Sequence, residues 1–431
     1  MRLVVTLACL LAAANAGMRP SPPYRLEYAL NRQLASSSSV GLTNHLGTQY
    51  MVDLAIDGKT YSVQIDTGSA DLWVGCEYVS TSACVNPCPA DGITITYGSG
   101  SACVVPHKGS ISLGNTAFSD GVFGIGMTSS VLGNVSQGIL GLAFPGLSSY
   151  GSFATNASYT VFHLDSFSMF LTPKSDQSGS KLVINGVDDA LVKSRNLVGV
   201  RIPLATGEKD YWNINITQFG VDAPTWNQKP CKNGDCMAIV DSGTSFLSMP
   251  KSVFQAFVTT YLLQDCAYKT SYYVCPKTLA LPRISFQFGD NSTVFYLNSW
   301  DYSLVYSETE IIIQVQVTPA GRLGDRWIIG DTFLKVYYTT YDVKAKAVVF
   351  YCPDGQCNGG ENVLDFSSSM PTWALVLFIA GGSLVGLSVI GLIVYYVRRR
   401  RATRQAKQPH SSVWVVDGDS PEASQTYTAA R

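Results

Sequence analysis

Charge and histidine are both scarce in this sequence. Only 14% of its 431 residues are Asp, Glu, Lys or Arg, the formal net charge is −1, and four residues are histidine. No basic cluster occurs before residue 398. Because a nucleic-acid-binding protein gathers positive charge to meet the phosphates, the sequence argues against nucleic acid as a partner. The few histidines also argue against a zinc site.

Helical periodicity is equally rare. In the part of the chain that we expect to be soluble, convincing helical spacing is confined to residues 251–263, where one face carries Val253, Phe254, Phe257, Val258 and Tyr261. Elsewhere short apolar runs alternate with turn signals, as in the run 50–56, the turn Asp57-Gly58 and the run 60–65. The length suffices for two cores. We therefore predict an all-β fold with few short helices.

Two distant segments repeat one short pattern. The segments are VQIDTGSADLWV at 63–74 and AIVDSGTS at 238–245. In each, an apolar run typical of a buried strand ends in an acid that is followed by a hydroxyl residue, a glycine and a second hydroxyl residue. A buried carboxylate needs hydrogen bonds, which these hydroxyls can supply, and glycine allows a sharp turn and close approach. The acids, Asp66 and Asp241, lie 175 residues apart, which predicts two related lobes that each contribute one acid.

Two carboxyls in one site have a definite chemistry. They cannot both ionise easily, so one keeps a proton while the other stays charged. The pair then supplies a general base for a water molecule and a general acid for a carbonyl or a leaving amine. The competing interpretation is that each segment is an ordinary β-turn in which the Asp accepts local amide hydrogen bonds.

Further motifs match one known family in order along the chain. They are ITYGSGS at 95–101, QGILGLA at 137–143, WIIGDTFL at 327–334 and YYTTYD at 337–342. With the two acid loops, they make residues 45–352 resemble the pepsin-like aspartic proteases. The resemblance implies a bilobal fold and peptide hydrolysis by Asp66 and Asp241, with no cofactor and no metal. A polypeptide substrate would bind extended in the cleft between the lobes.

The resemblance also implies roles for the neighbouring residues. Ser69 and Thr244 would hydrogen-bond the two carboxylates, while Thr67 and Ser242 would reach across to the opposite loop beside Gly68 and Gly243. Other residues would form the flap and contact substrate: Tyr97, Gly98, Ser99, Trp73, Ile139, Tyr211 and Gln64. The flap tyrosine of the family bonds to the indole that Trp73 matches. Gln64 stands where the family often has an apolar residue, and a polar substrate side chain would fit there.

The two ends of the chain carry targeting signals. Residues 1–16 have the positive start, short apolar centre and small-residue end of a secretory signal. Residues 372–397 lack charge and are followed by Arg398–Arg401, which predicts a transmembrane helix in a lipid bilayer and a type I topology. A lipid-anchor signal is the alternative, but the arginines and the 30 residues after them oppose it.

These signals divide the chain. We expect a short propeptide-like or disordered segment at 17–44, an N-terminal lobe at 45–200 and a C-terminal lobe at 201–358. A tether at 359–371 and a disordered cytoplasmic tail at 398–431 would flank the membrane helix. The catalytic part would be lumenal or extracellular, with the compartment undetermined.

Ten of the eleven cysteines lie between the signal and the membrane segment, an even number that suits disulfides in an oxidising compartment. We expect Cys231–Cys236, Cys266–Cys275 and Cys352–Cys357 to close short loops. Cys76, Cys84, Cys88 and Cys103 can pair in three ways, and zinc is the competing interpretation of the Cys84–Cys88 spacing. Four glycosylation acceptors occur in the same region: Asn134, Asn156, Asn215 and Asn291.

The sequence thus predicts a monomeric, membrane-anchored aspartic endopeptidase that acts on secretory-pathway or extracellular proteins. Two other functions remain open at this point. One is an inactive relative that binds peptides, although both acids, both glycines and the flap tyrosine are present. The other is an adhesion or receptor ectodomain, which the membrane segment would suit.

Overall fold

The computed structural model describes residues 38–80, 84–132, 135–149, 164–174, 178–205, 210–221, 236–319, 323 and 325–361. The expected signal, membrane helix and cytoplasmic tail lie outside these ranges. Among the described residues no helix is both long and apolar enough to cross a bilayer.

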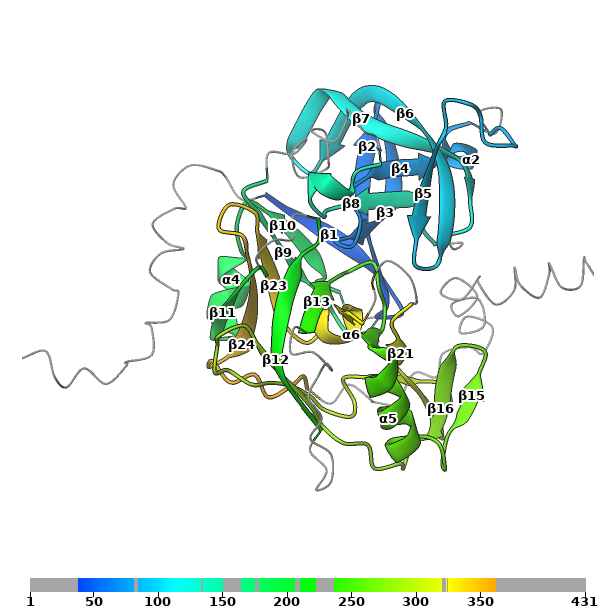
Figure 1. Cartoon of the computed structure of the whole chain (residues 1–431). Helices are drawn as coiled ribbons and strands as arrows, with labels where there is room; N and C mark the ends of the chain where they lie inside the picture. The colour runs from blue at the N-terminus through cyan, green and yellow to red at the C-terminus, as the bar shows by residue number, and fades with distance from the viewer. Residues whose placement is uncertain are drawn as a thin grey trace, which may run out of the picture. The chain divides into compact units, whose positions relative to one another are not determined.

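Over the described ranges the strands form three sheets, and the fold is mainly β as predicted (Figure 1). The first sheet has, in order, β11 (Leu197–Pro203), β24 (Ala347–Pro353), β23 (Tyr338–Asp342), β9 (Ser166–Phe170), β10 (Lys181–Ile184), β1 (Ser38–His45), β2 (Gln49–Ile56), β3 (Lys59–Asp66), β8 (Gly138–Gly141), β4 (Leu72–Gly75), β7 (Thr116–Ser129), β6 (Gly100–Leu113) and β5 (Ile93–Tyr97).

The other two sheets come from the second half of the chain. The second has β18 (Phe295–Leu297), β17 (Ile284–Phe288), β12 (Asn213–Val221), β13 (Cys236–Val240), β22 (Trp327–Ile329), β14 (Leu247–Met249) and β21 (Val315–Val317). The third has β15 (Ala267–Lys269), β16 (Tyr272–Pro276), β20 (Glu310–Ile313) and β19 (Ser303–Val305). The described helical elements are α2 (Cys76–Val79), η3 (Pro145–Leu147), α4 (Asp189–Ser194), α5 (Lys251–Tyr261) and α6 (Asp331–Leu334).

The two acid loops sit in the same local topology. In the first half, β3 pairs parallel with β8, β8 antiparallel with β4, and β4 parallel with β7. In the second half, β13, β22, β14 and β21 repeat the same three pairings in the same order. The predicted pair of related lobes is therefore present as a repeated four-strand unit.

The first sheet also joins the two halves. Strands β23 and β24, from the end of the described chain, lie beside β9 and β11 from its middle (Figure 1). Strand β11 spans residues 197–203. The predicted lobe boundary between residues 200 and 201 therefore falls inside a strand of the joining sheet.

The chain from 38 to 44 needs a correction. We expected residues 17–44 to be a short propeptide-like or disordered segment. Residues 38–45 form strand β1, so the disordered alternative is wrong for this part, and the propeptide-like alternative stays a prediction. Its first half pairs with β10 and its second half with β2. Val40 and Leu42 pack against the main core. Hydrogen bonds to two partner strands, together with these apolar contacts, order a segment that looks like a linker because it begins with two serines.

The helix predicted at 251–263 is α5, which ends at Tyr261. Val253, Phe257 and Val258 are its buried residues and pack into the core. We found no other helical spacing in the soluble sequence, yet α4 covers Asp189–Ser194. That helix has six residues, too few for a periodic pattern to be recognised, and it begins with the Asp188 side chain accepting from the Leu191 amide.

Candidate active site

Asp66 and Asp241 meet at the ends of equivalent strands. Asp66 is the last residue of β3, and Asp241 follows β13 directly. Backbone bonds from Leu142 N to Asp66 O and from Asp241 N to Ile329 O attach the two acids to β8 and β22 respectively. Both side chains are buried, with 6% and 8% exposed. They form a hydrogen bond with each other, so the fold brings the two predicted acids into one site.

Two glycines make this approach possible. A Cβ on Gly68 would lie 2.5 Å from Asp241 Oδ1, and one on Gly243 would overlap the Asp66 carboxyl. Any larger residue at either position would therefore push the opposite carboxyl away. This accounts for glycine in both copies of the motif.

Each carboxyl is held by its own loop in the same manner. Asp66 accepts from the Ser69 hydroxyl at 2.5 Å and from the Gly68 amide at 2.8 Å. In the second loop, Asp241 accepts from the Thr244 hydroxyl at 2.7 Å and from its own loop's glycine amide at 2.8 Å. These bonds orient both carboxyls and stabilise their charged forms.

The two acid loops also form hydrogen bonds with one another. The Thr67 hydroxyl donates to Val240 O and accepts from Ser242 N, both at 2.9 Å. The Ser242 hydroxyl donates to Ile65 O at 3.0 Å and accepts from Thr67 N at 3.2 Å. All four groups are buried. The reciprocal bonds therefore fix one acid loop against the other.

The electrostatics favour a proton in the site. Burial raises the pKa of Asp66 far above that of an ordinary aspartate, and the neighbouring charge of Asp241 raises it further. The hydrogen bonds from Ser69 and the Gly68 amide oppose this rise but do not cancel it. The pair therefore keeps a proton at pH values where a free aspartate is fully ionised.

Tyr97 is the last residue of β5 and lies near Asp66 and Ser69 of the first acid loop. Strands β5 and β6 pair as far as Tyr97 and Gly100, which leaves Gly98 and Ser99 as a two-residue turn. The Trp73 indole donates to the Tyr97 hydroxyl at 2.7 Å. Burial, and then the charge of Asp66, raises the pKa of Tyr97, so its hydroxyl stays neutral. A side-chain carbon at Gly98 would lie 3.7 Å from Pro319, so this hairpin reaches a loop of the other half.

The remaining predicted substrate contacts differ in position. Ile139 is buried in a small cluster with Trp73 and Ile95, beneath Tyr97. Gln64 is half-buried, and its amide nitrogen lies 3.5 Å from Gly243 O across the two loops. Tyr211 is half-buried two residues before β12, and its place beside the substrate stays a prediction.

Sequence reasoning missed Asp331. It lies in a motif used for the resemblance, but we gave it no role. Its side chain is fully buried, and neither carboxyl oxygen has a hydrogen-bond partner among the described residues. Burial, and then the charge of Asp241, raises its pKa well above the ordinary value, which favours a neutral third carboxyl near the dyad. The sequence did offer a signal for Asp331, because an acid follows a short apolar run there, as it does at Asp66.

The four cysteines of undetermined pairing form Cys76–Cys84 and Cys88–Cys103. The first bond uses two of the three side chains of the group Cys76, Glu77 and Cys84, whose ligand atoms lie close together, and so removes the thiols that a zinc ion would need. The predicted Cys266–Cys275 bond is present, and Cys236 is also in a disulfide. Its expected partner, Cys231, lies outside the described residues.

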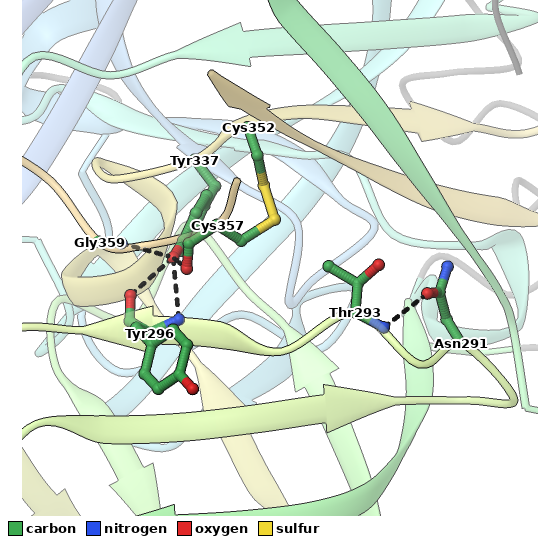
Figure 2. Close-up of a disulfide and its surroundings, with 7 residues drawn as sticks. All are labelled: Asn291, Thr293, Tyr296, Tyr337, Cys352, Cys357 and Gly359. Carbon is green, nitrogen blue, oxygen red and sulfur yellow. Dashed lines mark hydrogen bonds between the residues drawn. A yellow bond between two sulfur atoms is a disulfide. The ribbon is translucent and has the colours of Figure 1, made fainter. Parts of the chain in front are cut away.

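The third predicted disulfide, Cys352–Cys357, closes the loop after β24 (Figure 2). Beside it the Tyr337 hydroxyl accepts from the Tyr296 and Gly359 amides and lies 2.6 Å from Tyr296 O and 2.9 Å from Cys357 O. This single hydroxyl therefore attaches the end of the described chain to β18.

Two of the four predicted glycosylation acceptors can be located. Asn215 is exposed on β12. Asn291 is half-buried, and its side-chain oxygen accepts from Thr293 N at 2.8 Å (Figure 2). Asn134 and Asn156 lie outside the described residues.

Comparison with known proteins gives one consistent result. The family described as eukaryotic aspartyl protease matches residues 49–351. Pepsin A of Sus scrofa is 28% identical over 331 residues, covering 70% of this chain and 80% of pepsin A. Gastricsin of Cavia porcellus is 28% identical over 327 residues, covering 69% and 78%. The crystal structure of the aspartic proteinase from Irpex lacteus shares the fold, with a TM-score of 0.61, 19% identity and coverage of 77% of this chain and 100% of that one.

The chain therefore belongs to the eukaryotic aspartyl protease family. It is an endopeptidase of the pepsin-like class, a hydrolase of peptide bonds, as its motifs predicted.

Proposed function

We propose that Asp66 and Asp241 are the catalytic residues of this endopeptidase and that they share one proton. The hydrogen-bonded contact between two buried carboxyls, each held by a matching loop, is the observation that carries the proposal. One shared proton gives the site a base and an acid at the same time.

Peptide hydrolysis follows from that arrangement. A water molecule between the carboxyls gives a proton to the charged carboxylate while its oxygen attacks the scissile carbonyl carbon. The protonated carboxyl donates its proton to the carbonyl oxygen, which yields a neutral tetrahedral diol. The carboxyl that took the water's proton then gives it to the amide nitrogen, the C–N bond breaks, and a hydroxyl proton of the diol passes to the other carboxylate, so that the pair again holds one proton. No covalent bond to the protein forms at any stage.

The surrounding residues position the reactants. Ser69 and Thr244 hold the carboxyls, and Thr67 and Ser242 hold the loops together. The hairpin at Tyr97, Gly98 and Ser99 would close over an extended polypeptide and pair with its backbone as an additional strand. The Trp73 indole bond supports this role because it holds the Tyr97 side chain in place.

Mutation of each acid tests the dyad. The full chain, purified in detergent, would be assayed on quenched peptides between pH 3 and pH 8, with and without a statine-type inhibitor. Asp66→Asn and Asp241→Asn should each lower kcat by about 10²- to 10⁴-fold. The matched control is Asp53→Asn, on the exposed side of β2, which should keep wild-type activity. Full activity in either dyad variant would refute the assignment.

We also propose that the enzyme is a monomeric type I membrane glycoprotein that cleaves secretory-pathway or extracellular proteins. The apolar run at 372–397 with its following arginines, the signal-like start, the disulfides and the acceptor asparagines support this proposal.

Expression in a eukaryotic cell tests the anchoring. The chain should stay with membranes after an alkaline wash and should lose apparent mass on treatment with an N-glycosidase. A variant that lacks 372–397 should be secreted and should elute as a monomer. Recovery of the unaltered chain in the soluble fraction would contradict the anchor.

A further inference from the structure

Gln64 is an unusual neighbour for two catalytic carboxyls. Successive strand residues alternate between faces, so Gln64 and Asp66, two apart on β3, point to the same side. The backbone of Gln64 is fixed because its amide donates to the buried Ser136 hydroxyl at 3.1 Å. Its strand also pairs with β8 at Ile139. The side chain is half-buried, so part of it stays accessible beside the dyad.

The contact with Gly243 sets the orientation of the amide. The atom of Gln64 that faces Gly243 O is the nitrogen, at 3.5 Å. A backbone carbonyl can only accept, so the side-chain oxygen must be on the other branch of the amide. Within the described ranges that oxygen has no hydrogen-bond partner. The site therefore presents one free acceptor, Gln64 Oε1, beside the reacting carboxyls.

A bound peptide would cover this acceptor and take it out of water. An apolar substrate side chain against Gln64 would leave the oxygen without a partner, and a carboxylate side chain would face both this oxygen and the charge of the dyad. A side chain that donates a hydrogen bond would satisfy it. A site that hydrogen-bonds a polar group of its substrate discriminates strongly against an analogue that lacks this group. An apolar pocket discriminates less strongly against a substrate of the same shape that carries an extra polar group.

We infer that Gln64 is a specificity-determining residue that selects, at one substrate position beside the scissile bond, a side chain that donates a hydrogen bond. The inference rests on the proposed dyad, because Gln64 can discriminate only among peptides that are hydrolysed there. It differs from a purely structural role, in which Gln64 would join the two loops through Gly243 and leave substrate preference unchanged.

Paired peptides separate these roles. Thr and Val have nearly the same shape but differ in the hydroxyl, so a peptide series would carry one or the other at each position around the cleaved bond. For each position, kcat/KM is measured for wild type and for Gln64→Met, which keeps the length of the side chain and removes the acceptor. The control is Gln218→Met, the same substitution at an exposed position of β12.

We expect one position at which the Thr:Val ratio of kcat/KM is about 5- to 10-fold higher in wild type than in Gln64→Met, because one hydrogen bond to a desolvated acceptor is lost. Gln218→Met should give the wild-type ratio. A second pair, Lys and Met, should show the same direction of change at that position. Equal ratios in wild type and Gln64→Met at every position would overturn the inference.

The thermal unfolding of Gln64→Met and its cleavage of the Val peptides show whether the variant folds. If the variant folds, cleaves the Val peptides and has the wild-type Thr:Val ratio of kcat/KM at every position, Gln64 has only a structural role. The proposed catalytic dyad would still stand. If wild type cleaves none of the peptides, or Asp66→Asn cleaves as well as wild type, the proposed function fails and the inference fails with it.

Discussion

The reciprocal hydrogen bonds between the two acid loops predict that removing one hydroxyl lowers both the stability of the fold and kcat. Thr67→Val keeps the shape of the side chain but takes away the hydroxyl that donates to Val240 O and accepts from Ser242 N. Thr67 is fully buried, so water cannot replace these bonds. Each buried group left without a partner costs about 1–3 kcal/mol, so the two groups together lower the free energy of unfolding by about 2–6 kcal/mol.

Ser242→Ala should cost a similar amount, because its hydroxyl makes the mirror-image bonds to Ile65 O and Thr67 N. The two losses should not add. Once one hydroxyl is gone the loops separate slightly, and the bonds of the other weaken with them. The double variant should therefore lose little more stability than either single variant. Displaced loops also misplace the carboxyls, so each variant should lose about 10- to 100-fold in kcat.

Urea unfolding and steady-state kinetics measure both effects. The control is Thr339→Val, which removes a buried hydroxyl whose one bond within the described part of the chain is to Tyr337 O, two residues away. This variant should lose stability but keep its kcat. Strictly additive losses in the double variant, or an unchanged kcat in Thr67→Val, would refute the idea that these hydroxyls hold the site together.

Three further predictions follow from buried groups. Asp301, whose pKa burial raises to about 6, binds a proton more tightly in the folded protein than in the unfolded chain. Its contribution, about 3 kcal/mol, is therefore complete below pH 4 and is lost as the pH rises through 6, which urea unfolding across pH 3–8 would show. Asp331→Asn, which is neutral at every pH, should change stability little at pH 4 and increase it at pH 7.5. Trp73→Phe removes the indole donor to Tyr97 and should lower kcat/KM about 10-fold without changing the pH at which activity is highest.

For each of these three predictions, one experimental outcome would contradict it. A stability that rises from pH 4 to pH 8 would contradict the first, since a raised carboxyl pKa requires the opposite sign. An Asp331→Asn variant that is less stable than wild type at pH 7.5 would show that this carboxyl is ionised and needed. Unaltered kinetics in Trp73→Phe would mean that the indole does not position Tyr97.

The sequence was most informative where chemistry and local structure coincide. Both acid loops follow apolar strands, and the hydroxyls that hold the carboxyls lie three residues after each acid, so a short motif contains the whole arrangement of each half. The bond from Trp73 to Tyr97 could be expected only from the resemblance to a family, since the two residues lie on different strands.

The features that were missed depend on contacts between distant segments. The pairing of Cys88 with Cys103 follows from the position of β6, which no spacing rule gives. Asp331 lies near the dyad because α6 begins there. Strand β1 is held by β10, about 140 residues further along the chain, and its own sequence is rich in serine. Local propensity carries no information about such partners.

Strand β1 also limits how the enzyme could mature. Residues 38–41 pair with β10 and residues 42–45 pair with β2, so this strand connects the part of the first sheet that joins the two halves to the part that carries Asp66. A processing protease that cut within it would release half of those bonds and expose the edges of both neighbours. An activation cleavage that leaves these bonds intact would therefore have to fall upstream of Ser38.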